Sequence, residues 1–333
     1  MDEVIVVLVV VVIAAVVFDF INGFHDTANA IATVIATRVL AAWQAILMAA
    51  GLNFLGALSG TAVAKTIGSG LIDAQAISQG AVLAALLGAI FWNLLTWYYG
   101  IPSSSSHALV GGIIGGAVAH AGVGAPLWGA IVQKTVLPFV LSPIIGFVLA
   151  FVLMAVVLNL FQRAGRRAMG AIFGKAQLAS SAFMAFSHGS NDAQKTMGVI
   201  TIALFSAGMI GSNDVPTWVI IVSALAMALG TAAGGWRIIR TMGTRLTHLE
   251  PVHGFVAETA AASVIEVASR AGFPLSTTHT IASTIMGVGA TRGPNYVRWN
   301  VAGNMVTAWI LTIPATAAVA FVVYKLLSLL GAD

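Results

Sequence analysis

The chain has 333 residues, of which 59% are hydrophobic and only 8% are charged, with a formal net charge of +4. Soluble domains carry about 25% charged residues, so this composition predicts an integral membrane protein. The chain has no cysteine, which excludes disulfides, thiolate metal sites and cysteine nucleophiles. The basic residues gather at 163–175 and 237–245, as in the cytoplasmic loops of membrane proteins. The net charge therefore gives no reason to expect nucleic-acid binding.

Apolar segments of roughly 17–25 residues, the length of a membrane helix, follow one another along the whole chain. Before the basic stretch at 162–176 we expect them at 3–18 with a broken continuation to about 37, 43–64, 77–99, 101–118, 124–141 and 143–161. After it we expect them at 177–204, 216–236, 251–270, 273–290, 295–312 and 314–331. The segments at 101–118 and 273–290 are rich in glycine and hydroxyls, which indicates re-entrant hairpins buried within protein.

This pattern predicts an all-α, polytopic membrane protein made of two repeats. The first repeat spans 1–161, a basic cytoplasmic linker spans 162–176, and the second repeat spans 177–333. Each repeat is expected to have about five full crossings and one hairpin. Because five is odd, the second repeat should be inverted relative to the first, and both chain ends should lie outside the cell.

Two polar motifs occur twice, in the same order. Residues 20–26, FINGFHD, return at 186–192 as FSHGSND, and residues 102–107, PSSSSH, return at 274–279 as PLSTTH. Polar and ionisable residues within membrane segments are costly and mark functional sites. Inverted repeats with interrupted helices are typical of secondary transporters.

The first motif combines a carboxylate with residues that favour a helix break. Asn22 and Gly23 are predicted to interrupt the helix, which would free backbone carbonyls for a cation and amides for an anion. Asp26 and Asn29 lie three residues apart and share a helix face, as do Asp192 and Lys195. The simpler interpretation is a buried hydrogen-bonded pair between helices, but the carboxylate occurs in both copies.

The second motif offers consecutive hydroxyls after a proline. Hydroxyls and the amides of a first helical turn can surround a tetrahedral oxyanion, although such runs also join membrane helices by hydrogen bonds. The candidate anion ligands are Ser104, Ser105, Ser106, Ser276, Thr277 and Thr278.

Three further ionisable residues are candidates for coupling or gating. His107 and His279 end the two hydroxyl runs at equivalent positions and could be anion donors, proton carriers or structural caps. Glu258 has Ala84 as its counterpart in the first half. It could be a coupling group or form an ion pair with Lys195 or Arg270.

Two other classes of function fit the pattern less well. A hydrolase needs one nucleophile beside one base, whereas here the same polar set occurs twice, so we expect no enzyme. A passive anion channel would differ from a transporter in never accumulating its solute against a gradient.

At these motifs the chain resembles the inorganic phosphate transporter family, often called PiT, and most closely its bacterial low-affinity branch. The family signature is Gly-x-Asn-Asp-x-x-Asn-Ala in each half, with Ser-Thr-Thr-His or a close variant in each hairpin. The resemblance covers the whole chain. It implies phosphate symport, an inverted-repeat fold with the site between the halves, and homodimers.

The resemblance also implies roles for individual residues. Cation coordination falls to Asp26, Asn29, Asn191, Asp192 and Asn22, with a Na⁺ site at Asp26 and Asp192, and these two carboxylates would also face the phosphate. Two positions depart from the signature: His25 replaces its first asparagine, and Gln194 and Lys195 replace its second alanine and asparagine. A lysine that projects into the site would repel Na⁺ or stand in for it. We therefore hypothesise coupling to H⁺, or carriage of a neutral metal–phosphate, with His25 and Lys195 as further coupling candidates.

The sequence thus predicts a transporter that imports inorganic phosphate with H⁺ or Na⁺ by alternating access, in the plasma (inner) membrane. Sulfate is the alternative substrate, because hydroxyls and amides accept either anion. No cofactor is expected, although a divalent metal could travel with the phosphate.

Overall fold

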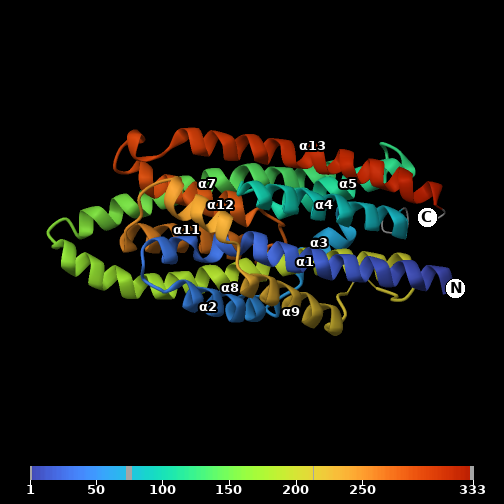
Figure 1. The fold of residues 1–333 in the computed structure, drawn as a ribbon, viewed down its shortest axis with the longest axis horizontal. Coiled ribbons are helices and arrows are strands. Elements are labelled where there is room, and N and C mark those ends of the chain that lie inside the picture. The colour runs from blue at the N-terminus through green and yellow to red at the C-terminus, as the bar shows by residue number, and fades with distance from the viewer. Residues whose placement is uncertain (1, 73–76, 213, 331–333) are drawn as a thin grey trace.

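Two long helices, α1 (Asp2–Ala36) and α8 (Arg166–Ser206), run side by side through the molecule (Figure 1). The computed structural model describes residues 2–72, 77–212 and 214–330, so the extreme ends of the chain, whose outside location we predicted, lie outside the described residues. Both helices are continuous through their polar motifs, and the predicted break at Asn22 and Gly23 is therefore wrong. A Cβ at Gly23 would lie 2.5 Å from the carbonyl oxygen of Met227. The glycine serves close helix packing rather than a helix break.

The remaining helices follow the same order in each half of the chain. In the first half they are α2 (Ala42–Ala57), α3 (Ala62–Ser69), α4 (Gln79–Tyr99), α5 (Ser105–Ala121), α6 (Trp128–Ile131), a π-helical turn (Val132–Val136) and α7 (Leu137–Leu160). In the second half they are α9 (Thr217–Ala233), α10 (Trp236–Arg240), a π-helical turn (Thr241–Arg245), α11 (Pro251–Arg270), α12 (Thr277–Ala290), a 3₁₀ turn (Pro294–Tyr296) and α13 (Trp299–Leu329). The all-helical membrane fold predicted from the sequence is confirmed.

Several predicted boundaries were wrong. The segments expected at 124–141 and 143–161 form one helical run, as do those expected at 295–312 and 314–331, because Pro143 and Pro314 lie inside α7 and α13. Membrane helices tolerate proline where neighbouring groups and local π-helical adjustments satisfy the freed backbone, and a π-helical turn precedes α7. The basic stretch 162–176, expected as a linker, is helical from Arg166.

Helix contacts recur in matched pairs across the two halves. Helix α1 packs on α9 while α8 packs on α2, and α5 packs on α13 while α12 packs on α7. Equivalent glycines allow the first two contacts, since a Cβ at Gly230 would overlap the carbonyl oxygen of Phe20, and one at Gly56 would overlap that of Phe186. The two halves are therefore interlocked rather than set side by side.

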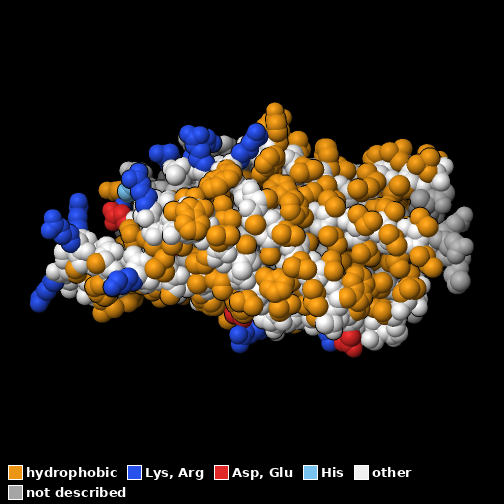
Figure 2. Space-filling view, turned by 60° about the horizontal axis from the view of Figure 1, so that its bottom comes forward, with side chains coloured by type: hydrophobic (Ala, Val, Ile, Leu, Met, Phe, Trp, Pro, Cys, Tyr) orange, Lys and Arg blue, Asp and Glu red, His pale blue; other side chains and the backbone are white. Residues whose placement is uncertain are grey.

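Among the described residues, four helical segments are long and apolar enough to cross a bilayer, or up to six if each bent helix pair counts as one span. The bent pairs are α2 with α3, at 69°, and α9 with α10, at 61°. The start of α1 and the end of α13 lie at one end of the molecule, and the α7–α8 turn lies at the other (Figure 1). Figure 2 shows that most Lys and Arg side chains in that view gather at the end that holds this turn.

Candidate functional site

Near the middle of the bundle, α1 and α8 each carry one buried aspartate into a cluster of polar side chains. Asp26 accepts hydrogen bonds from Ser105 Oγ at 3.0 Å and Thr278 Oγ1 at 3.4 Å, and its Oδ1 lies 2.7 Å from His25 Nδ1. The other ring nitrogen of His25 lies 3.1 Å from Thr96 Oγ1. The carboxylate of Asp26 thus has hydroxyl partners from both halves of the chain.

The second aspartate has a cationic partner. Asp192 forms an ion pair with Lys195 on the next turn of α8 and accepts a hydrogen bond from Thr277 Oγ1 at 3.0 Å. Lys195 is almost fully buried and also donates to Ser106 Oγ at 2.5 Å. The lysine therefore does project into the site, as the sequence hypothesis requires.

The hydroxyl runs open the short helices α5 and α12. Ser104 and Ser276 accept hydrogen bonds from the backbone amides of His107 and His279, at 3.2 and 3.1 Å. These two serines are helix caps, so their side chains are already engaged. The next two residues of each run reach the charged groups: Ser105, Thr277 and Thr278 donate to the carboxylates, and Ser106 accepts from Lys195.

Cross-contacts join the two halves into one site. Asn29 of α1 donates to Thr277 Oγ1 at 3.2 Å and Thr278 Oγ1 at 2.9 Å, while Ser106 of α5 donates to the Leu275 carbonyl at 3.0 Å. The amino ends of α5 and α12 consequently approach one another beside the carboxylates, and the positive end of a helix dipole attracts anions.

Asp26, His188 and Asp192 each place a ligand atom within 4.8 Å of the other two, a grouping that could hold a cation. His188 Nε2 lies 3.2 Å from Asp192 Oδ2. Our sequence reasoning missed His188, although its alignment with Asn22 in the repeated motif was the available signal.

Other predicted residues make no hydrogen bond to Asp26 or Asp192 among the described residues. Asn191 donates to Ser269 Oγ at 2.8 Å, and among the described residues the side-chain atoms of Asn22 have no hydrogen-bond partner. The rings of His107 and His279 pack on each other with centroids 4.3 Å apart, and His279 also stacks on Trp309.

Glu258 forms a separate buried cluster near the carboxyl end of α1. It accepts hydrogen bonds from Thr33 Oγ1 at 2.5 Å, Ser180 Oγ at 2.5 Å and Gln177 Nε2 at 3.2 Å. It has no ion pair with Lys195 or Arg270 among the described residues, and Arg270 pairs instead with Glu266.

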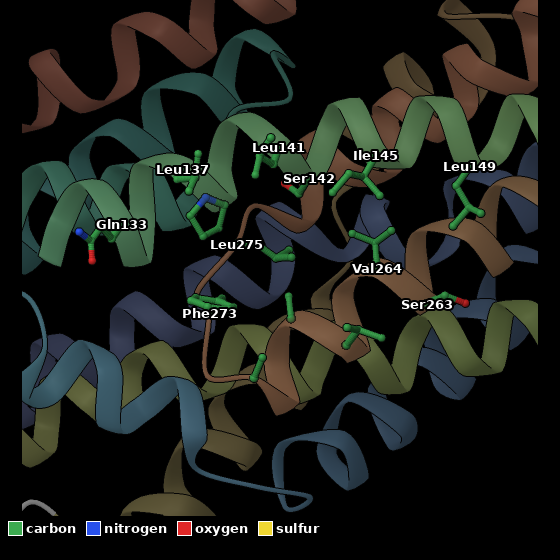
Figure 3. Close-up of a pocket in the computed structure, with 14 residues that line it drawn as sticks. Gln133, Leu137, Leu141, Ser142, Ile145, Leu149, Ser263, Val264, Phe273 and Leu275 are labelled. Atoms are coloured by element: carbon green, nitrogen blue, oxygen red, sulfur yellow. The ribbon is translucent and has the colours of Figure 1, made fainter.

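A cavity of about 510 Å³ lies between α7 and α11 on the side of the bundle (Figure 3). Its lining is mainly apolar, with Leu141, Ile145 and Val264 among the residues that face it. None of the carboxylates lines this cavity, and its chemistry suits hydrocarbon rather than an ion.

A helical bundle with membrane-length apolar helices, whose two halves jointly build a buried polar centre, is typical of a membrane transporter. A family model described as the phosphate transporter family matches residues 22–320. The chain therefore belongs to the phosphate transporter family, whose transported substrate is phosphate, and it is not an enzyme.

Individual relatives agree with this assignment. The chain is 48% identical over 319 residues to a "Probable low-affinity inorganic phosphate transporter" of Rhizobium meliloti (strain 1021), covering 95% of each chain. It is 45% identical over 333 residues to a protein of the same name from Bacillus subtilis (strain 168), covering 99% of this chain and 100% of that one. A solved structure titled "The sodium-dependent phosphate transporter" superposes with a TM-score of 0.89 at 25% identity, covering 97% of this chain and 99% of that one.

Proposed function

We propose that the chain is a secondary active transporter that imports inorganic phosphate together with a cation by alternating access. The observation that carries this proposal is the shared centre: two buried carboxylates, Asp26 and Asp192, meet hydroxyls from both halves at the amino ends of α5 and α12. Such a centre can bind an anion and a cation next to one another, which symport requires.

Anion recognition would use the hydroxyls of Ser105, Ser106, Thr277 and Thr278, the amides of the first turns of α5 and α12, and the ammonium group of Lys195. Phosphate keeps a proton near neutral pH, whereas sulfate has none. A carboxylate such as Asp26, which accepts hydrogen bonds, therefore favours phosphate over sulfate. An ammonium group in a buried site adds a charge-assisted hydrogen bond, stronger than one between neutral groups.

Cation coupling would take place at the same carboxylates. Lys195 already neutralises Asp192, which leaves Asp26, with His25 and His188 nearby, for a mobile cation. We propose that this cation is H⁺ rather than Na⁺, because Lys195 already supplies a positive charge beside Asp192. In addition, α1 and α8, which carry both carboxylates, are continuous helices, unlike the unwound helices that coordinate Na⁺ in other transporters. The grouping of Asp26, His188 and Asp192 is also consistent with a divalent metal carried with the phosphate.

Alternating access would occur between two inverted repeats. The matched contacts of α1 with α9 and of α8 with α2 support this relation, as do the opposite directions of α1 and α8 (Figure 1). Because basic loops lie inside, the end with the α7–α8 turn would be cytoplasmic, and both chain ends would be outside the plasma membrane. By the family resemblance we also propose that the protein is a homodimer.

The test is uptake of labelled phosphate by purified protein in liposomes, with the membrane potential clamped. An inward proton gradient should drive accumulation, and an inward sodium gradient at equal pH should not. Accumulation under sodium alone would keep symport but overturn the proton assignment. Downhill flux without accumulation would indicate a channel, and accumulation of sulfate but not phosphate would overturn the substrate.

A further inference from the structure

A third aspartate, Asp19, lies on α1 seven residues before Asp26, on the same side of the helix. Its side chain is fully buried, with 0% exposure. Among the described residues neither of its carboxylate oxygens forms a hydrogen bond or an ion pair. No motif drew attention to this residue, since its counterpart in the second half is Ala185.

Other unpaired polar groups surround this carboxyl group. Asn22 and Thr196 lie close enough to act on it as weak hydrogen-bonding neighbours, but among the described residues neither side chain makes a hydrogen bond of normal length and geometry. The charged groups within electrostatic reach of Asp19 are Asp192 and Lys195 of α8. Asp19 therefore lies beside the second carboxylate centre, although it belongs to the helix that carries the first.

The other helices packed on α1 bring no charge to this position. Helices α2 and α9 contain no ionisable residue, and α4 contains only Tyr98 and Tyr99, which are exposed at its far end. The remaining ionisable residues on elements packed against α1 are not among the charged groups that act on Asp19: Arg166, Arg167, Lys175, His188, Arg237, Arg240, Arg245, His253, Glu258, Glu266, Arg270 and His279. Of these, Glu258 contacts α1 at Thr33.

An ionised carboxylate without a partner is very costly in a buried, apolar setting. It must therefore be neutralised, either by a bound metal cation or by a proton. The oxygens available to a metal are the two of Asp19, the amide oxygen of Asn22 and the hydroxyl of Thr196. Transporter sodium sites add unwound backbone carbonyls, and α1 and α8 are unbroken here. The chemistry favours a proton.

We propose that Asp19 is a proton-binding site of the transport cycle, placed next to the centre formed by Asp192 and Lys195. The carboxyl group takes a proton from water on one side of the membrane and releases it to water on the other, and only its O–H bond forms and breaks. This inference rests on the proposed function, because it adds to Asp26 a second proton-binding carboxyl group that accumulation requires.

The experiment compares Asp19→Asn, which mimics the protonated state, with Asp19→Glu and wild type in liposomes. Two fluxes are measured: net phosphate accumulation driven by a proton gradient, and exchange of internal for external phosphate, which needs no net proton movement. Asp19→Asn should lose accumulation and its dependence on pH but retain exchange, whereas Asp19→Glu should retain both. Asp214→Asn, an exposed change in a loop, is the matched control and should behave like wild type.

Full proton-driven accumulation by Asp19→Asn would overturn the inference while leaving the proposed function intact. A variant that loses both fluxes, yet purifies as a stable protein that still binds phosphate, would also overturn it, because the residue would then be needed for movement of the site itself. If wild type accumulated phosphate only with sodium, and Asp19→Asn lost that dependence, Asp19 would hold a metal cation instead of a proton. Failure of wild type to accumulate phosphate under any gradient would reject the proposed function.

Discussion

The two carboxylate centres occupy equivalent positions in the two halves, but they are built differently. The segments that lead up to the two aspartates, 20–26 and 186–192, are similar. The residue three positions after the aspartate, however, is Asn29 in the first half and Lys195 in the second. Asn29 donates to Thr277 and Thr278, and Lys195 donates to Ser106 and pairs with Asp192. Each of these two residues therefore donates to a hydroxyl run of the opposite half, and the lysine also adds a positive charge.

Under the proposed function, this difference would give the two halves different tasks. Asp192 is paired with a cation that is part of the chain, whereas in the described part of the chain the partners of Asp26 are hydroxyls and the His25 ring. A site with one fixed and one exchangeable positive charge needs fewer cations from solution than a symmetric site would. The predictions below test that difference.

The largest effect is expected from Asp192→Asn. The change leaves Lys195 buried without its carboxylate, and breaking a buried ion pair in this way costs about 3–5 kcal/mol. We expect no phosphate uptake and a clear fall in the melting temperature of the purified protein. Asp26→Asn should also abolish uptake but lower the melting temperature much less, because no fixed cation loses its partner.

The double variant Asp192→Asn with Lys195→Gln is the matched control. It removes both charges, so it should recover thermal stability without recovering uptake. Equal destabilisation by Asp26→Asn and Asp192→Asn would contradict the proposed division of charge between the centres.

The second prediction concerns Lys195→Asn, which gives the second half the residue found in the first. Without the ammonium group, Asp192 needs a cation from solution, so uptake should become dependent on Na⁺. Loss of one interaction worth about 1.4 kcal/mol corresponds to roughly tenfold in affinity, and we expect at least that decrease in uptake at low Na⁺. Lys175→Asn, an exposed change on the same helix, should leave the sodium dependence unchanged. If uptake by Lys195→Asn depended on Na⁺ no more than uptake by wild type does, the role of Lys195 as a built-in cation would be refuted.

The third prediction tests whether the two interlocked contacts are equivalent. Gly56→Ala and Gly230→Ala would each place a methyl group against a backbone carbonyl of the facing helix, and overpacking costs about 1–3 kcal/mol. Thermal unfolding of the two variants should show similar losses. Gly51→Ala has open space around it and should be neutral or slightly stabilising. A much larger loss for one glycine than for the other would mean that the halves do not pack alike.

The smallest effect is expected from removing single hydroxyls. Ser105→Ala and Thr277→Ala each delete a hydroxyl that donates to the carboxylate of its own half at 3.0 Å. One hydrogen bond is worth about 1 kcal/mol net, which corresponds to roughly fivefold in apparent phosphate affinity. Thr277→Ser should keep the wild-type affinity. If both alanine variants kept it too, the anion would bind elsewhere.

Several of the residues predicted from the sequence come together in the candidate site, but their arrangement was not predicted. Of the six predicted hydroxyls, Ser104 and Ser276 turned out to cap helices, and Asn191 turns away to Ser269. These outcomes depend on the exact rotation of each helix about its axis, and a repeat motif does not encode that rotation. The expected helix breaks at Asn22, Pro143 and Pro314 failed for a related reason: local helix preferences were overridden by packing within a membrane bundle.

The sequence by itself determined the class of this protein, because membrane burial requires apolar segments and leaves every retained charge conspicuous. It also determined which chemistry is present, since the duplicated carboxylates and hydroxyls can be read directly from the repeats. Only the tertiary structure decided which groups meet. The contact of Lys195 with Ser106, the approach of His188 to Asp26, and the position of Asp19 beside Asp192 and Lys195 involve helices far apart in the chain, and such contacts follow from how the helices pack rather than from local spacing.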